Sequence, residues 1–429
     1  MQTILKKNIQ QQILARSLYM SSILLINIAL ARFTNAAATG SLFYAMALFT
    51  LIVLLGGISL ESALGYFYAG KKMSVQQLIK IAFFQIGIVI ILIYSVQLFF
   101  PSWFTLLSSG FTQGLYIFVI GTLLSNYFLA VLYADKQYLS SNIIQTALNL
   151  LLLVVLWFQH KHFNDNNLLF QTYFYFILLN GILIFTLFVY KSRKTKMTIK
   201  NVQLSHIYRY AFQALWANVL FFLVYRLDYW FVHQYTSANA SGNYIQAAKL
   251  AQLIILIPQF VAPVIFNSVA ANSSSHQIHV VIIALMKLLL LLSILLLTIL
   301  LISGQYIFTQ LLGNSFNHLH YILLLLLPGL FFLSCLNLLS AYFAGINRIR
   351  INMIGAGLAA IVTCIGNICI IPFYSIYWAA CISSLSYITA SVWAIYHYRK
   401  LNPSISLVLF KLYPSDWKTI CSLFYIKNV

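Results

Sequence analysis

Long apolar runs, separated by short polar or basic interruptions, recur along the chain from Ile13 to Tyr396. Each run contains about twenty residues, which is enough for an α-helix to cross a hydrocarbon core of about 30 Å. The pattern predicts spans at 13–32, 42–69, 78–100, 111–134, 139–158, 168–190, 207–234, 244–271, 280–303, 318–344, 352–371 and 373–397. We therefore expect an all-α polytopic membrane protein of about twelve transmembrane helices.

The longest polar interruption, 191–206, divides the predicted spans into six plus six. Duplicated six-helix bundles are common among secondary transporters. We therefore expect two six-helix lobes around a central cavity. The boundaries that follow are an N-terminal lobe at 1–190, a cytoplasmic basic linker at 191–206, a C-terminal lobe at 207–400 and a cytoplasmic interfacial tail at 401–429.

Composition agrees with a membrane protein. Hydrophobic residues make up 62% of the 429 residues and charged residues only 7%, whereas soluble domains contain roughly 25% charged residues. The formal net charge of +20 would suggest nucleic-acid binding in a soluble protein. Here the basic residues lie between apolar runs instead of forming one face, so membrane topology explains them and no nucleic-acid partner is expected.

The distribution of Lys and Arg predicts the orientation of the chain. Cytoplasmic loops of membrane proteins carry an excess of these residues. With the N-terminus inside, 21 of the 25 Lys and Arg residues are on the cytoplasmic side, and both termini are cytoplasmic. The four exceptions are Arg32, Lys161, Arg226 and Lys249.

Three of these exceptional cations lie in or at the ends of predicted spans: Arg32, Arg226 and Lys249. A charge at the centre of a membrane helix costs at least about 2.5–3.5 kcal/mol, so such residues need a partner or a function. Together they could line a path for an anionic substrate. Alternatively, Arg226 could pair with Asp228 or Glu61. Lys249 could likewise pair with Asp228, and Arg32 could extend to the interface.

Glu61 is the one carboxylate in the predicted spans of the first half. It precedes Lys71 by about ten residues, or about 15 Å of helix, which predicts a position near the middle of the bilayer. A carboxylate there could exchange a proton or bind sodium during transport. The alternative is a salt bridge to Arg226 that ties the two lobes together.

The remaining motifs do not indicate an enzyme or a cofactor. The stretch 65–72 nearly matches a phosphate-binding loop, but it lacks the hydroxyl residue and follows a predicted membrane helix instead of a strand. The five cysteines form no CxxC pair, so neither a disulfide framework nor a metal site is expected. We expect solvated histidines in loops or at span ends for His160, His162, His276, His279, His318 and His320.

Several short motifs, in this order, resemble those of Wzx-type lipid-linked oligosaccharide flippases. They include 30–33 (LARF), Gly40, Gly57, 61–63 (ESA), Gly65, 225–229 (YRLDY), 242–244 (GNY), 247–250 (AAKL), Pro258, 344–348 (AGINR), Asn352, Asn367 and Pro372. The likeness spans nearly the whole chain. The sequence departs from the pattern at 372–376 (PFYSI), where the family usually has glycines.

The resemblance implies the fold of the multidrug/oligosaccharidyl-lipid/polysaccharide exporter superfamily, with two six-helix lobes around a cationic cavity that faces alternate sides. It also implies an undecaprenyl-pyrophosphate-linked sugar repeat unit as cargo, for O-antigen or capsule assembly at the inner membrane of a bacterium. A polysaccharide polymerase and a chain-length regulator are the implied protein partners. Arg32, Arg226 and Lys249 would then bind the anionic part of the cargo.

Two other functions remain open. A membrane polymerase or ligase of lipid-linked sugars needs acidic or basic groups above the membrane, but the longest predicted outer connection is 303–317 and Asp165 is the one outer-loop carboxylate. A drug exporter of the same superfamily should line its cavity with carboxylates, and the chain has only five Asp and Glu residues.

Overall fold

The computed structural model describes residues 2–70, 72–101, 109–163, 165–193, 202–252, 254–271 and 276–403. Within these ranges the regular structure is helical and no strand occurs. Ten of the described helices are long and apolar enough to cross a membrane. The chain forms two compact units, Met1–Val219 and Leu220–Val429. The protein is therefore an all-α polytopic membrane protein with two lobes.

The described residues of unit 1 form seven complete helices and the first part of an eighth. Side chains just before several of them accept hydrogen bonds from first-turn N–H groups, which stabilises helix starts. Asn35 caps α2, Ser74 caps α4 and Asp165 caps α8. The helices are α1 (Gln2–Phe33), α2 (Ala36–Gly57), α3 (Leu60–Ala69), α4 (Val75–Phe99), α6 (Ser109–Ala134), α7 (Tyr138–His162), α8 (Asn166–Ser192) and the start of α9 (Leu204–Tyr235).

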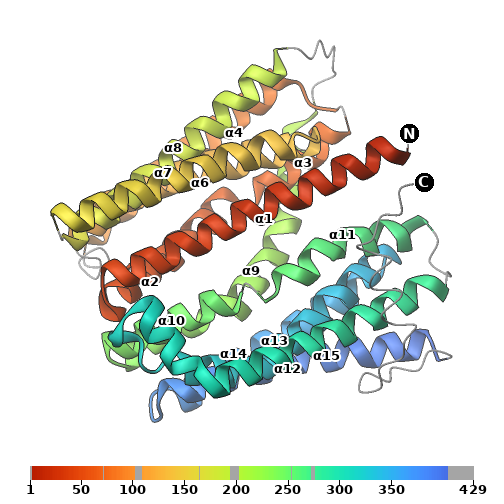
Figure 1. The fold of residues 1–429 in the computed structure, drawn as a ribbon. Helices are drawn as coiled ribbons and strands as arrows, with labels where there is room; N and C mark the ends of the chain where they lie inside the picture. Colours follow the sequence, from red (N-terminus) through yellow and green to blue (C-terminus); the bar gives the residue numbers. More distant parts are fainter. Residues whose placement is uncertain are drawn as a thin grey trace. The chain divides into compact units, whose positions relative to one another are not determined.

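In the described part of unit 2, the rest of α9 is followed by six further α-helices (Figure 1). They are α10 (Ala238–Ala251), α11 (Leu256–Ala271), α12 (His276–Leu312), α13 (Leu319–Gly345), α14 (Ile349–Ile370) and α15 (Ile376–Leu401), with a 3-10 turn at Asn314–Phe316. In Figure 1, α12, α13, α14 and α15 run side by side. Their length and apolar character explain why the hydrophobic pattern locates them from sequence alone.

Corresponding helices make the tightest packing in the two units. The most buried candidate spans are α6 in unit 1 and α13 in unit 2, which correspond to the fourth predicted span of each half. A Cβ atom added to Gly121 of α6 would lie 2.6 Å from the Cα of Leu178 in α8. One added to Gly329 of α13 would lie 2.5 Å from the Cα of Ser384 in α15. Glycine therefore allows direct backbone approach in each unit, as is common between membrane helices.

Enlarging either glycine should loosen its unit. We expect Gly121→Ala and Gly329→Ala each to lower the free energy of unfolding by about 1–3 kcal/mol, because the new methyl group meets backbone that cannot rotate away. Thermal unfolding of the purified protein in detergent measures the effect. Matched controls are Gly87→Ala in α4 and Gly357→Ala in α14, where an added Cβ meets nothing within 4 Å. Equal unfolding temperatures for all four variants would contradict the close approach.

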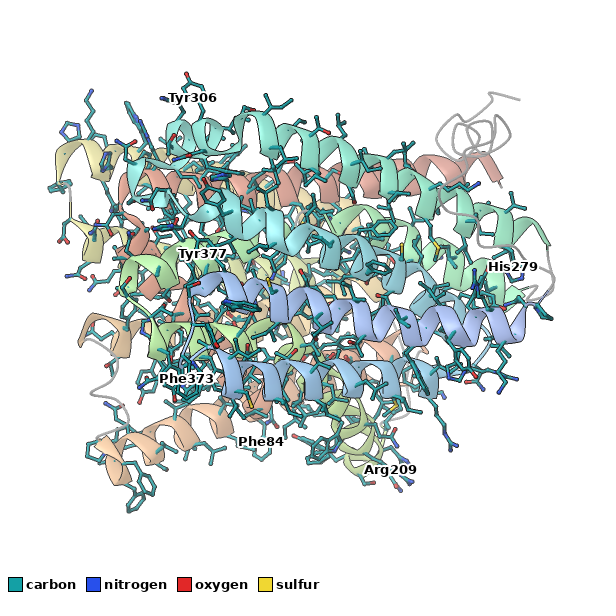
Figure 2. The ribbon with its side chains drawn as sticks, turned by 90° about the horizontal axis from the view of Figure 1, so that it is seen from below. Phe84, Arg209, His279, Tyr306, Phe373 and Tyr377 are labelled. Carbon is teal, nitrogen blue, oxygen red and sulfur yellow. The ribbon has the colours of Figure 1, made fainter. Side chains whose placement is uncertain are left out.

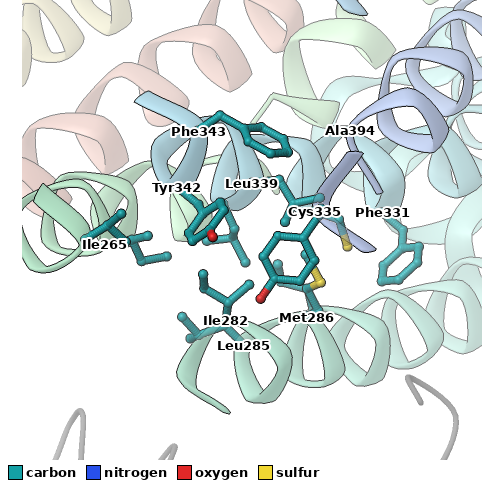
Figure 3. Close-up of a cluster of buried hydrophobic side chains, with 14 residues drawn as sticks. Ile265, Ile282, Leu285, Met286, Phe331, Cys335, Leu339, Tyr342, Phe343 and Ala394 are labelled. Carbon is teal, nitrogen blue, oxygen red and sulfur yellow. The ribbon is translucent and has the colours of Figure 1, made fainter. Parts of the chain in front are cut away.

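The apolar core of unit 2 is centred on α13 (Figure 3). Six α13 side chains contact residues from α11, α12 and α15, so this helix holds its neighbours together. Figure 3 shows Phe331, Cys335 and Leu339 of α13 close to Met286 of α12 and Ala394 of α15. The remaining members of the cluster are Ile265, Val269, Ile282, Leu285, Leu289, Leu338, Tyr342, Phe343 and Tyr398.

Two predicted spans are each divided into two helices. The predicted span 42–69 corresponds to α2 and α3, which are separated at Ile58 and Ser59. The predicted span 244–271 corresponds to α10 and α11, which are separated between Ala251 and Leu256. Apolar runs lie on both sides of each break, so the apolar pattern by itself predicts one long span in each place.

The predicted outer connection 303–317 is wrong. Helix α12 continues to Leu312, and a 3-10 turn at Asn314–Phe316 occupies most of the remainder. Polar residues end the apolar pattern at Ser303 without ending the helix, because Gln and Thr are compatible with helical backbone.

The prediction of solvated histidines is wrong for His279 and His320, which are only 5% and 8% exposed. The His279 Nδ1 atom is 2.7 Å from the hydroxyl of Tyr398, which belongs to α15. Figure 2 shows His279 at one end of the helices of unit 2 and Tyr377 at the other. A partner about 120 residues away in sequence satisfies the buried imidazole, so local sequence could not reveal its burial.

Half of the predicted linker 191–206 and nearly all of the predicted tail 401–429 lie outside the described residues. The lobe boundaries at 190 and 207, the interfacial character of the tail and the cytoplasmic position of both termini therefore stay predictions.

Candidate functional site

Arg226 and Lys249 lie on the two arms of a helical hairpin formed by α9 and α10 in unit 2. The turn is at Thr236 and Ser237, where the Ser237 hydroxyl accepts a hydrogen bond from the backbone N–H of Ala240. At about 1.5 Å per residue, Arg226 is about 14 Å from the end of α9 and Lys249 about 17 Å from the start of α10. Both cations are therefore close to the middle of a hydrocarbon core of about 30 Å.

The Arg226 guanidinium is held by two hydrogen bonds. One of its nitrogens donates to the hydroxyl of Tyr229, one turn further along α9, and the other donates to Gln252 Oε1 at 3.1 Å. The guanidinium carbon is also 4.9 Å from the centre of the Tyr229 ring, within cation–π range. Arg226 is nevertheless only half-buried. The side chain is therefore oriented and still partly accessible.

Lys249 belongs to the same cationic site. It lies two residues before the end of α10 at Ala251 and is half-buried. Gln252, which accepts a hydrogen bond from Arg226, lies three residues after Lys249 and directly follows the end of α10. Lys249 and Arg226 are close enough for their charges to interact. The structure thus brings together two of the three cations that the sequence singled out.

Asp228 is held by hydroxyl groups instead of by Arg226. Its side chain is 2% exposed and accepts hydrogen bonds from the hydroxyls of Tyr244 and Ser383, the latter at 3.1 Å. It also accepts one from the backbone N–H of Tyr229 at 2.9 Å. The hydrogen bonds of Arg226 go to Tyr229 and Gln252. Three donors therefore satisfy this carboxylate without a direct ion pair to the arginine.

The break between α2 and α3 in unit 1 is a strained structure. Ile58 and Ser59 both have left-handed backbone, with φ of 52° and 51°, and this conformation is rare for a β-branched residue such as isoleucine. Asn218 Nδ2 donates to the Ser59 hydroxyl at 3.0 Å. Such backbone persists only where its surroundings impose it, and it is concentrated at functional sites.

Side chains from neighbouring helices also bind the carbonyl groups that the break releases. Gln85 Nε2 of α4 donates to the Gly56 carbonyl at 2.6 Å, and the Tyr127 hydroxyl of α6 donates to the Gly57 carbonyl at 3.3 Å. Free carbonyl groups inside a membrane are costly unless they are satisfied in this way. The break is therefore built into the packing of unit 1.

Glu61 lies in the first turn of α3, directly after the break. About 12 Å of helix separates it from the end of α3, whereas α2 alone is about 33 Å long. Glu61 is thus nearer to the end of α3 than to Asn35 before α2. Arg32 is exposed in the last turn of α1 just before Asn35, so the length of α2 separates it from Glu61.

The broken spans occupy corresponding places in the two halves of the chain, because each is the second span of its predicted six. Each break also has an ionisable residue beside it: Glu61 follows Ser59 by two residues, and Lys249 precedes Gln252 by three. In transporters, interrupted helices at corresponding positions of two repeats indicate where substrate and coupling ions bind. The breaks therefore mark Glu61 and Lys249 as candidate site residues.

Sequence reasoning missed several polar residues that the fold buries. Lys287 was assigned to the cytoplasmic cations, but it is 3% exposed in α12. Gln246 and Asn367 are fully buried, and neither amide makes a hydrogen bond to any described residue. The signal available in the sequence was a strongly polar side chain inside an apolar run. That signal does not reveal which polar residues meet.

No known family model and no curated protein sequence matches the chain. Solved structures do. The lipid II flippase MurJ, in an inward closed conformation, is similar over 96% of this chain and 96% of its own, with a TM-score of 0.68 and 16% identity. An inward-facing multidrug resistance MATE family transporter of the MOP superfamily covers 92% of this chain and all of its own, with a TM-score of 0.65 and 14% identity. The chain shares the fold of these transporters.

A MOP superfamily transporter from Pyrococcus furiosus is also similar, over 95% of this chain and 97% of its own, with a TM-score of 0.62 and 14% identity. The three similarities extend over nearly the whole length of each chain, so the shared feature is the complete two-lobed fold. At these identities the likeness concerns the fold alone. The chemistry of the cargo has to be inferred from the residues described above.

Proposed function

We propose that this protein is a flippase that moves undecaprenyl-pyrophosphate-linked oligosaccharide repeat units across the bacterial inner membrane by alternating access, for O-antigen or capsule assembly. The observation that carries the proposal is the pair of half-buried cations, Arg226 of α9 and Lys249 of α10, whose charges are close enough to interact. The shared fold with a protein named as a lipid II flippase supports a lipid-linked cargo. The motifs that resemble Wzx-type flippases support a glycan.

An anion fits this site for electrostatic reasons. Two like charges near the middle of a membrane repel each other strongly, because the surroundings have a low dielectric constant. A pyrophosphate or an acidic sugar bound beside Arg226 and Lys249 would relieve that repulsion. The fork of Arg226 is oriented by Tyr229 and Gln252 and suits bidentate binding of phosphate oxygens. Arg32 is included in the proposal as a third cation that meets the cargo at the end of α1.

Glu61 and Asp228 are proposed as the groups that couple transport to an ion gradient. Glu61 follows a helix break, a position at which transporters bind coupling ions. Asp228 is surrounded by hydroxyl oxygens of Tyr244 and Ser383, which can accommodate a proton or a small monovalent cation. A salt bridge from Glu61 to Arg226 that ties the lobes together is the competing role for Glu61.

The setting of this activity follows from the same proposal. The protein would work in the inner membrane with both termini in the cytoplasm, because 21 of its 25 Lys and Arg residues fall on that side of the predicted topology. It would act without a cofactor and without catalysing a covalent reaction. A polysaccharide polymerase and a chain-length regulator would receive the translocated units.

Drug export is the second candidate function, because MATE transporters share the fold. The buried carboxylate of Asp228 could attract a cationic drug. However, Asp228 is fully engaged by Tyr244, Ser383 and Tyr229, whereas Arg226 is partly accessible. The accessible charge described in unit 2 therefore favours an anionic cargo.

Reconstitution distinguishes the two functions. Purified protein in liposomes should move a fluorescent polyprenyl-pyrophosphate oligosaccharide between leaflets at least about tenfold faster than protein-free liposomes, and should not expel a cationic dye such as ethidium. The lipid without its pyrophosphate group is the matched control and should not move, since the cations would have nothing to bind. Dye export without glycolipid movement would replace the proposal by drug export.

A further inference from the structure

A cavity of about 490 Å³ lies in unit 1 between the first turns of α4 and the start of α9. Its lining includes neither the cations Arg226 and Lys249 nor the residues of the α2–α3 break, Ile58 and Ser59. None of the described residues that line it is acidic, and Lys80 supplies a positive charge. The lining residues are Ser74, Gln76, Gln77, Lys80, Ile81, Phe84, Leu204 and Tyr208.

Hydrogen bonds between α4 and the segment that leads into α9 hold this cavity in shape. Gln77 Nε2 donates to the Val202 carbonyl at 2.6 Å, and the Val202 N–H donates to Gln77 Oε1 at 3.2 Å. Two turns further along α4, Gln85 Oε1 accepts a hydrogen bond from the Tyr208 hydroxyl at 3.1 Å. The cavity is therefore part of the folded unit and does not require a ligand to form it.

One side of the cavity is polar and cationic. Gln76 and Lys80 are exposed, and neither side chain has a hydrogen-bond or ion-pair partner among the described residues. The N-terminus of α4, whose first residue is Val75, adds a partial positive charge on this side. The ammonium group of Lys80 and the amide of Gln76 can both donate hydrogen bonds to a bound oxyanion.

The other side of the cavity is apolar and faces outward. Phe84 is 65% exposed and Leu204 is 54% exposed. Further along α4, the side chains of Ile91 and Leu92 are also exposed, as expected for a surface that contacts lipid chains. The cavity thus lies where a charged group at the start of α4 meets an apolar helix surface. Figure 2 labels Phe84 of this surface and Arg209, the residue after Tyr208.

We propose that this cavity binds an anionic glycerophospholipid of the surrounding bilayer, with the phosphate at Lys80 and Gln76 and an acyl chain along Phe84. Free inorganic phosphate presents the same kind of oxyanion as the phosphate group of such a lipid. The lipid is favoured because half of the lining is apolar and continues into the exposed surface of α4. Basic pockets between membrane helices recognise lipid headgroups in this way.

The charge distribution supports the same occupant. Five Lys and Arg residues precede Val202 within the predicted cytoplasmic linker 191–206. Anionic lipids are enriched in membrane leaflets that face the cytoplasm and attract basic segments there. This inference does not depend on which cargo the protein transports, because no residue of the cavity belongs to the proposed transport site.

Native mass spectrometry of the delipidated full-length protein tests the proposal. The probes are short-chain phosphatidylglycerol, phosphatidylcholine with the same chains, and inorganic phosphate. We expect phosphatidylglycerol to bind at least about fivefold more tightly than phosphatidylcholine. Lys80→Ala should weaken phosphatidylglycerol binding about fivefold, which corresponds to about 1 kcal/mol for one lysine near the membrane surface. Lys80→Arg should retain binding, because it keeps the charge.

Lys161→Ala is the matched control, because Lys161 is an exposed cation in the last turn of α7 in the same unit, lies outside the basic linker and does not line the cavity. Its phosphatidylglycerol affinity should equal that of the wild type. A photoactivatable phosphatidylglycerol should label peptides that contain Phe84 or Leu204. Wild-type affinity in Lys80→Ala would overturn the proposal. Displacement of the lipid by inorganic phosphate at equal concentration would overturn it too, by showing a site for free phosphate.

Discussion

Arg226→Ala and Lys249→Ala should each reduce movement of the lipid-linked glycan at least about tenfold while the protein remains folded in the membrane. Each removes one cation from the site on α9 and α10, and a hydrogen bond to a charged group contributes about 1.5–3 kcal/mol. Loss of that interaction corresponds to about a tenfold to hundredfold weaker affinity for the cargo. The measurements are surface polysaccharide on whole cells and accumulation of the lipid-linked unit inside.

The matched control for this pair is Lys161→Ala. Lys161 is an exposed cation at the end of α7, where its ammonium group lies 5.4 Å from the ring centre of Trp157. Its removal changes the net charge by the same amount without touching the proposed site, so export should stay normal. Full export by both Arg226→Ala and Lys249→Ala would exclude the cationic site and leave only the sequence resemblance to Wzx-type flippases to support a glycan cargo.

Two further substitutions separate cargo binding from internal pairing. Arg226→Lys keeps the charge but loses the planar fork, so it should remain as impaired as Arg226→Ala if the site grips phosphate with two parallel hydrogen bonds. Asp228→Asn should not rescue Arg226→Ala, because hydroxyls and a backbone N–H already satisfy Asp228. Rescue would show that the arginine serves mainly to neutralise the aspartate.

Glu61→Gln should leave the protein folded and abolish the dependence of transport on an ion gradient, with a rate loss of about tenfold or more. The substitution removes the charge beside the α2–α3 break and keeps the size and shape of the side chain. The test compares reconstituted transport with and without imposed proton and sodium gradients. Glu61→Asp, which keeps the carboxylate, should retain gradient dependence at a reduced rate.

Asp165→Asn is the control for Glu61→Gln, because Asp165 is a carboxylate before α8 whose role is to accept a hydrogen bond from the Asn167 N–H. Asparagine also caps helices well, so both stability and gradient response should be unchanged. If Glu61→Gln responds to the gradients like the wild type, Glu61 has a structural role only, and Asp228 becomes the proposed coupling group.

Much of the candidate site could be located from sequence, because a charge inside an apolar run is conspicuous. Arg226, Lys249 and Glu61 were identified in this way, and Arg226 and Lys249 do lie close together. The partners of these residues could not be identified. Gln252 and Tyr229 are ordinary polar and aromatic residues in the sequence, and only the packing of α9 against α10 makes them ligands of the guanidinium.

The helix breaks illustrate the same limit. The predicted span 42–69 runs through Gly56, Gly57, Ile58 and Ser59, because apolar runs lie on both sides of these residues. The left-handed backbone there depends on Gln85, Tyr127 and Asn218, which come from three other helices. No window of sequence around the break contains these residues, so a continuous span from 42 to 69 was the natural prediction.

The sequence by itself determined that this is an all-α protein of the lipid bilayer, and it located most of the spans. A run of about twenty apolar residues must form a helix in lipid, because the backbone there has no other hydrogen-bond partner. Tertiary structure alone decided where spans break, why His279 is buried, and that Asp228 meets Ser383, which is 155 residues away. Hydrophobic burial follows from local composition, whereas the partner of a buried polar group depends on which helices the fold places side by side.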